Sequence, residues 1–90
     1  MLIVLWPLPV RAAGTASIDA AISEGKCREA ATTATAALVE APSAALWRLL
    51  GDARRCLGET RPAALAYRRY LSEVGPDPTV EVLLRGLRER

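Results

Sequence analysis

Two stretches within residues 44–78 repeat apolar side chains at helical spacing, and this pattern restricts the fold more than any other feature of the chain. The first stretch places on one stripe Leu46, Trp47, Leu50, Ala53 and Leu57. The second does the same with Ala63, Ala66, Tyr67, Tyr70, Leu71 and Val74. Recurrence at three and four residues is typical of an amphipathic helix. Ser43 is a suitable N-cap for the first stretch. Between the two stretches, Gly58 is a suitable left-handed C-cap, Thr60 an N-cap, and Pro62 fits a first helical turn. The stretch therefore predicts a helical hairpin with a short loop.

A weaker copy of this pattern precedes it by 33 residues. It predicts a short helix from Thr15 to Gly25 and a second helix from Cys27, or one residue earlier, to about Glu40, before Pro42. In this copy the places of Trp47, Gly51 and Tyr67 are taken by Gly14, Ile18 and Ala34. We therefore expect the earlier hairpin to pack loosely.

The C-terminal segment predicts one more helix. Asp77 is a suitable N-cap, and Pro78 fits the first helical position. One face of this segment is apolar and consists of Val80, Leu83, Leu84 and Leu87. The chain is rich in alanine and has no phenylalanine, and its prolines and glycines fall mainly between the periodic segments. We predict an all-α fold of two antiparallel hairpins, closed by a last helix that caps the second hairpin.

The second hairpin resembles the tetratricopeptide (TPR) repeat. The residues that resemble it are Trp47, Leu50, Gly51, Gly58, Ala63, Tyr67, Tyr70 and the Gly75-Pro76 break. The resemblance implies one good repeat over about residues 44–77, a degraded repeat over about 11–43 and a capping helix, which together make a fragment of a right-handed α-solenoid. It also implies that Gly51 and Ala63 are small because two helices cross closely there. Arg54 departs from the family, which usually has an aromatic residue at this position.

The resemblance further implies a binding scaffold whose groove is lined by the first helix of each hairpin. Arg48, Asp52 and Arg55 share one helix face, and Asp19 matches the same surface on the earlier hairpin. We expect Asp52 to hold both guanidinium groups, so that they can bind an acidic or C-terminal peptide segment. The alternative is a surface salt-bridge trio that satisfies itself.

The N-terminal residues 1–16 differ in character from residues 17–90, which we take as the helical domain. An apolar run over residues 2–10 is followed by Arg11 and small residues, and this looks like a secretory signal peptide cleaved after Ala13 or Ala16. Nine apolar residues are too few for a membrane-spanning helix, which needs about 20. The alternatives are an uncleaved apolar arm that packs on the helices and an interfacial membrane anchor.

The two cysteines, Cys27 and Cys56, are predicted to form one disulfide. Cys27 begins the second predicted helix and Cys56 ends the third, and consecutive antiparallel helices bring these two ends together. A disulfide and an export signal predict a periplasmic or extracellular protein. The alternative is a cytoplasmic protein with two reduced, buried thiols.

The composition does not favour an enzyme. The chain has no histidine, which removes the commonest general base and most zinc and haem ligation. It also lacks a glycine-rich phosphate loop. We predict no enzymatic activity, no cofactor and no metal. The formal net charge is +2, and the arginines scatter around several helix faces, so nucleic acid is not an expected partner.

Three functional hypotheses follow. The first is a small module that binds a protein or an acidic peptide and does no chemistry of its own. The second is a structural subunit that completes its core by forming a homo-oligomer or joining a larger assembly. The third is an accessory protein attached to a membrane through residues 2–10.

Overall fold

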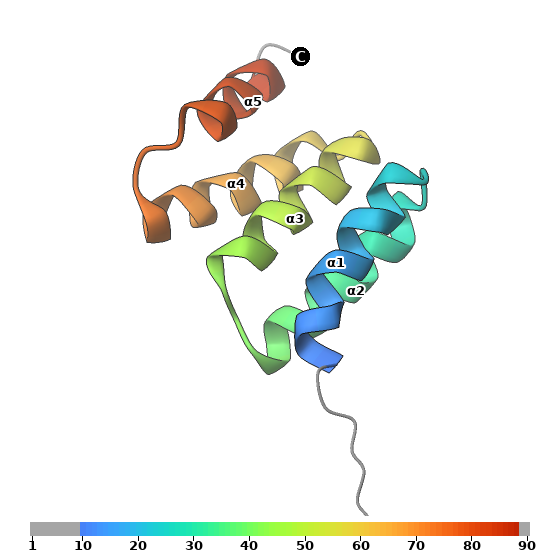
Figure 1. Cartoon of the computed structure of the whole chain (residues 1–90). Coiled ribbons are helices and arrows are strands. Elements are labelled where there is room, and N and C mark those ends of the chain that lie inside the picture. Colours follow the sequence, from blue (N-terminus) through green and yellow to red (C-terminus); the bar gives the residue numbers. More distant parts are fainter. Residues whose placement is uncertain (1–9, 89–90) are drawn as a thin grey trace, which may run out of the picture.

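The computed structural model describes residues 10–88, which form five α-helices and no strand (Figure 1). The helices are α1 (Val10–Ser23), α2 (Cys27–Glu40), α3 (Ala44–Cys56), α4 (Thr60–Val74) and α5 (Pro78–Arg88). The predicted all-α fold is confirmed. Residues 2–9 of the predicted apolar run over residues 2–10 lie outside the described residues.

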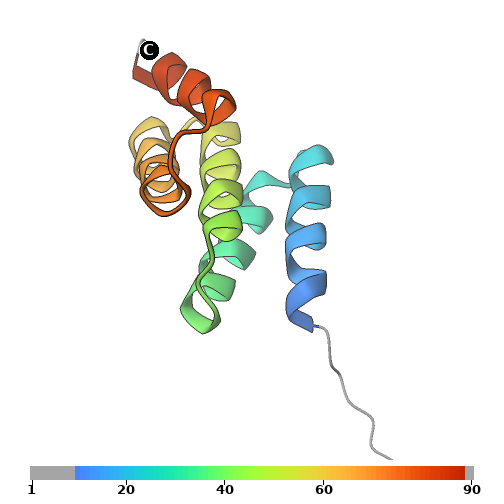
Figure 2. The same ribbon diagram turned by 60° about the vertical axis from the view of Figure 1, so that its left-hand side comes forward.

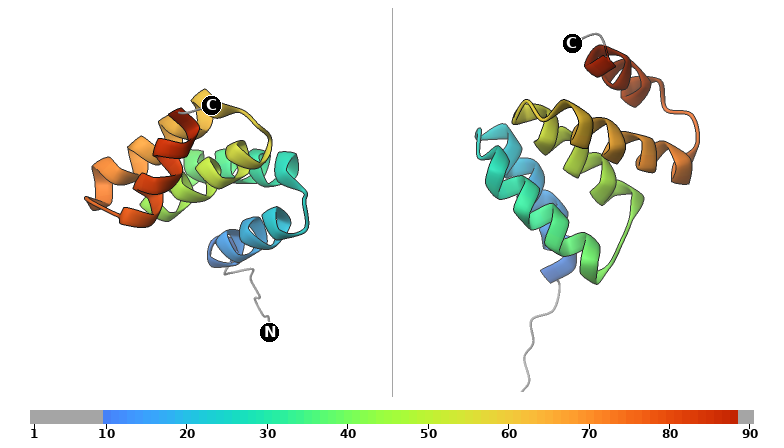
Figure 3. Two further views of the ribbon diagram at one scale, coloured as in Figure 1. Left: turned by 90° about the horizontal axis from the view of Figure 1, so that it is seen from above. Right: turned by 180° about the vertical axis from the view of Figure 1, so that it is seen from behind.

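Each helix packs against the next one along the chain, and α1 also packs against α3. Helices α1 and α2 form one hairpin, α3 and α4 form the second, and α5 follows α4 across a turn (Figure 1). Helices α1 and α3 run in the same direction (Figure 2). Seen from above and from behind, α5 lies next to α4 and away from α1 and α2 (Figure 3). The right-handed solenoid geometry stays a prediction.

Most helix ends follow the predicted local chemistry. The Ser43 hydroxyl accepts a hydrogen bond from the Leu46 backbone N–H at 3.3 Å, which caps α3. Asp77 Oδ1 accepts one from the Thr79 N–H at 3.1 Å at the start of α5. Gly58 has φ +79°, a conformation that favours glycine, and it turns the chain between α3 and α4.

Two helix starts differ from the prediction. Helix α4 begins at Thr60 itself, and the residue before it, Glu59, makes no side-chain cap. Helix α1 begins at Val10, five residues before the predicted Thr15. Its alanines favour helix, and Gly14 alone does not stop it. The helix therefore runs through the expected boundary between residues 16 and 17.

The buried side chains form two clusters. The first joins α1, α2 and α3 and contains Ile18, Ala30, Ala31, Ala34, Leu38, Leu46 and Ala53. The second joins α4 and α5 and contains Ala63, Ala64, Tyr67, Val80 and Leu87. Val80 is fully buried, so α5 covers one side of α4 as a capping helix should. Val74, the last residue of the predicted stripe, is about half exposed and does not belong to either cluster.

The two hairpins place different side chains at the point where their helices cross. A Cβ atom on Gly51 would lie 2.6 Å from the ring atoms Cδ1 and Cε1 of Tyr67, so the expected close approach at Gly51 is confirmed. In the first hairpin the corresponding residues are Ile18 and Ala34, which are 1% and 0% exposed. Both residues belong to the first buried cluster, with a large side chain on the first helix and a small one on the second, and the expectation of loose packing stays a prediction.

Candidate binding groove

An open groove of about 660 Å³ runs between α1, α3 and α4. It is lined by Thr15, Ala16 and Asp19 from α1, by Ala44, Ala45, Arg48, Leu49 and Asp52 from α3, and by Tyr70 and Val74 from α4. The groove exists because α1 and α3 run in parallel, one from each hairpin, and α4 closes its far side. The first helix of each hairpin therefore lines it, as expected.

The lining combines small side chains with charges of both signs. Ala16, Ala44 and Ala45 leave room for another polypeptide backbone to approach α1 and α3. The charged groups are two carboxylates, on Asp19 and Asp52, and one guanidinium, on Arg48. A segment bound here could therefore meet both hydrogen-bond acceptors and a cationic donor.

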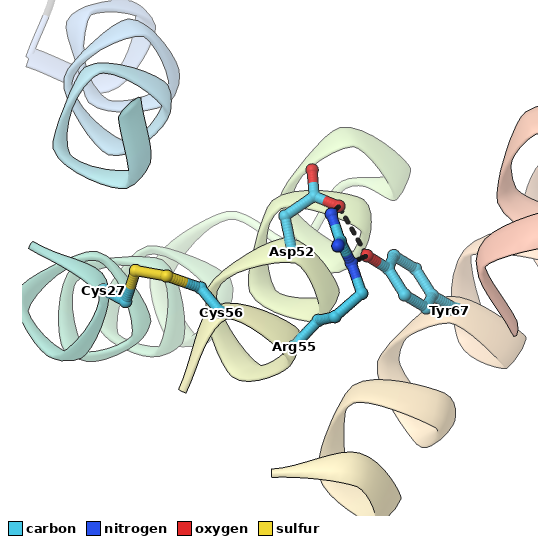
Figure 4. A network of polar contacts seen from close by, with 5 residues as sticks. All are labelled: Cys27, Asp52, Arg55, Cys56 and Tyr67. Carbon is cyan, nitrogen blue, oxygen red and sulfur yellow. Dashed lines mark hydrogen bonds and ion pairs between the residues drawn. A yellow bond between two sulfur atoms is a disulfide. The ribbon is translucent and has the colours of Figure 1, made fainter. Parts of the chain in front are cut away.

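Asp52 is held by a hydrogen-bonded network that includes a tyrosine (Figure 4). The Tyr67 hydroxyl donates to Asp52 Oδ1 at 2.5 Å, and Arg55 Nε donates to the Tyr67 oxygen at 3.1 Å. The Arg55 Nη2 atom lies 4.0 Å from the same carboxylate oxygen. These contacts orient the Asp52 side chain on a helix face that borders the groove.

The environment of Tyr67 keeps its hydroxyl protonated. Burial, and secondly the hydrogen bond to Asp52, raise the pKa of Tyr67 to about 12. The hydrogen bond with Tyr67 also raises the pKa of Arg55. At neutral pH the Tyr67 phenol is therefore neutral, and its hydroxyl can donate a hydrogen bond to the Asp52 side chain.

Arg48 lies in the groove lining one helical turn before Asp52 on α3. The Tyr70 hydroxyl donates to Asp77 Oδ2 at 2.7 Å; this bond is the main cause of a raised pKa for Tyr70 and a lowered pKa for Asp77. The nearby Arg48 charge is a smaller influence that favours the ionised form of both. Among the described residues, Arg48 and Asp52 form no ion pair, so the expected clamp of two arginines on Asp52 does not form.

The structure thus brings Asp19, Arg48 and Asp52 to the groove and leaves Arg55 outside its lining. Arg55 instead contacts Tyr67, which the sequence analysis placed only on the apolar stripe of its helix and in the repeat pattern. The spacing of fifteen residues between Asp52 and Tyr67 spans the hairpin turn and gives no local signal.

The cysteine pair lies where it was predicted. The Cys27 and Cys56 sulfur atoms are at disulfide distance, and the Cα atoms are 6.0 Å apart (Figure 4). The pair joins the start of α2 to the end of α3. It therefore links the first hairpin to the second. The link is at the end of α3, next to Arg55.

In the part of the chain that the structure describes, no three Cys, Asp or Glu side chains gather in a way that could hold a metal ion. No helix there is long and apolar enough to cross a bilayer. Comparisons of the chain with protein-family models, with curated proteins and with solved structures found no match.

Proposed function

We propose that the protein is a non-enzymatic, TPR-like interaction module that binds an extended protein segment in the groove between α1, α3 and α4. The observation that supports this most directly is the groove itself, in which both hairpins and charges of both signs meet. In this proposal the parallel helices α1 and α3 each form one wall of the binding groove.

The chemistry of the lining favours a partner that carries a carboxylate. The Arg48 guanidinium can bind an acidic side chain or a chain terminus through two hydrogen bonds. Asp19 and Asp52 can accept hydrogen bonds from backbone N–H groups of the same segment. Because a single groove offers a small area, we expect weak binding.

The disulfide supports a place outside the cytoplasm. Disulfides persist in oxidising compartments such as the periplasm and the extracellular space. We propose that the protein works in such a compartment.

Site-specific photo-crosslinking in the native host tests the groove. A photoreactive amino acid replaces Ala45, an exposed alanine in the groove lining, and in a matched control it replaces Ala36, an exposed alanine of α2 outside the groove. We expect one discrete cross-linked partner at position 45, none at 36, and loss of the product when Arg48→Glu is added. Equal products at both positions, or a product that persists with Arg48→Glu, would refute the groove as the binding site.

A further inference from the structure

The outer face of α4 carries an exposed leucine between arginines. Arg61, Leu65 and Arg68 are separated by four and three residues, so they share one face of the helix, and all three are exposed. Leu65 is 64% exposed, which is high for a large apolar side chain. This face shares no residue with the groove described above.

Two shallow depressions meet at Leu65. One, of about 600 Å³, lies between α3 and α4 and is lined by Trp47, Leu50, Arg54, Pro62, Leu65, Ala66, Arg68 and Arg69. The other, of about 530 Å³, lies between α4 and α5 and is lined by Thr60, Arg61, Ala64, Leu65, Arg68, Leu87 and Arg88. Leu65 and Arg68 belong to both, so the two depressions form one continuous surface without a carboxylate in its lining.

The positive charge of this surface is only partly neutralised. Arg54 pairs with Glu59 at 2.7 Å. Arg69 pairs with Glu73 at 3.0 Å and also lies over the Trp47 ring, 5.3 Å from its centre.

The remaining arginines of the surface, Arg61, Arg68 and Arg88, form no ion pair with any described residue. Arg61 also lies in the first turn of α4, which contains no acidic residue. The helix dipole disfavours a cation there. The fold therefore places three arginines on one face without a carboxylate among the described residues to neutralise them.

We propose that this basic face, defined by Arg61, Leu65, Arg68 and Arg88, docks an acidic segment of a partner protein. Carboxylates of the partner bind the guanidinium groups of these three arginines, whose planar geometry matches them. An apolar side chain of the partner covers Leu65. The protein then has two binding surfaces on different sides of α4, and either can exist without the other.

Two features favour an acidic protein segment over other anions. The depressions on either side of Leu65 can each receive a side chain, whereas a bilayer presents a flat surface. The only aromatic residue in the lining is Trp47, and the Arg69 guanidinium lies over its ring, so the face has no free stacking platform for nucleic-acid bases.

The test uses the full chain and a defined probe. The probe is a fluorescent peptide with both ends blocked, made of repeated Glu-Glu-Leu units, and the control peptide repeats Gln-Gln-Leu. We expect the acidic peptide alone to bind, more weakly as salt rises. Shifts in the amide NMR spectrum should fall on α4 and α5 and leave Asp19 and Ala45 unmoved.

Matched variants separate this face from the overall charge. Arg61→Glu with Arg68→Glu should weaken binding about tenfold or more, as expected for close charge pairs at an interface. Lys26→Glu with Arg28→Glu changes the net charge equally at exposed positions near the start of α2, outside the face, and it should weaken binding less than about twofold, through long-range effects only. Leu65→Ser keeps every charge and should also weaken binding.

Several results would overturn the proposal. These are equal weakening by the two charge-reversed pairs, full binding by Leu65→Ser, and NMR shifts confined to the groove. Tighter binding to vesicles rich in phosphatidylserine or to oligothymidylate than to the acidic peptide would also overturn it, by assigning the face to a membrane or a nucleic acid.

Discussion

Replacing Gly51 by alanine tests the closest contact in the second hairpin. The new Cβ would lie 2.6 Å from two ring atoms of Tyr67 and 3.1 Å from Cγ, where ordinary contacts are 3.4–4 Å. The ring cannot easily move away. It is completely buried, and its hydroxyl is hydrogen-bonded to Asp52 and Arg55.

The expected magnitude is the balance of three effects. Overpacking costs about 1–3 kcal/mol. Weakening hydrogen bonds to charged groups costs up to about 1.5–3 kcal/mol if the hydroxyl is displaced. Alanine returns about 0.8–1 kcal/mol through its higher helix propensity. We expect a net loss of about 1–3 kcal/mol in the free energy of unfolding, since the first cost alone roughly equals or exceeds the gain.

Urea unfolding followed by circular dichroism measures this loss. Gly86→Ala is the matched control, because Gly86 also lies within a helix and a Cβ there meets nothing within 4 Å. That substitution should stabilise the protein by about 0.5–1 kcal/mol. If Gly51→Ala stabilises the protein as much as Gly86→Ala does, the close approach of α3 to the Tyr67 ring is not present in solution.

Three further predictions concern the disulfide, the cap and Tyr67. Cys27→Ser with Cys56→Ser should lower the free energy of unfolding by about 3.5 kcal/mol under oxidising conditions, from the entropy of a loop closed over 29 residues, and hardly at all in reductant; equal effects in both would exclude the bond. Val80→Asp buries a carboxylate and should cost about 3 kcal/mol or more, whereas Val82→Asp on the same helix, 59% exposed, should cost under about 1 kcal/mol; similar losses would mean that α5 does not cap α4. Tyr67 has a folded pKa of about 12 against about 10 unfolded, so its contribution is complete below pH 10 and declines as pH rises towards 12; Tyr67→Phe should decline less steeply over that range, and parallel curves would contradict the buried phenol.

The helices could be predicted because their signals are local. Ser43, Gly58 and Asp77 each act within a few residues, and their caps and turn are in place. The start of α1 was missed because Gly14 interrupts the apolar pattern, although the alanines around it support helix. Helix propensity, which does not depend on a pattern, was the signal that could have extended it.

The sites depended on contacts that spacing does not encode. One helix face carries Arg48, Asp52 and Arg55, and this predicted a common environment for them. Arg55 instead donates a hydrogen bond to Tyr67 and does not line the groove. The basic face was equally hidden, because Arg88 reaches Arg61 only when α5 folds back along α4. In the sequence these arginines look scattered over separate helices.

The two hairpins fill equivalent helix crossings with opposite pairs of side chains. In the first hairpin Ile18 on the first helix accompanies Ala34 on the second, and in the second hairpin Gly51 accompanies Tyr67. Each pair joins one large and one small side chain. A crossing of fixed spacing can accept either assignment as long as the total volume is kept.

This complementarity predicts a compensating exchange. Gly51→Ile alone should be severely destabilising, because its Cβ already collides with the Tyr67 ring before the longer side chain is added. Tyr67→Ala alone leaves a cavity and should cost about 3–5 kcal/mol. Combined, the two substitutions give the second hairpin a large side chain on its first helix and a small one on its second, as in the first hairpin. The double variant should therefore lose about 1–3 kcal/mol less free energy of unfolding than the sum of the two single losses. If the two losses simply add in a double-mutant cycle, the side chains at positions 51 and 67 do not fill the same volume. The helix crossings of the two hairpins would then not be equivalent.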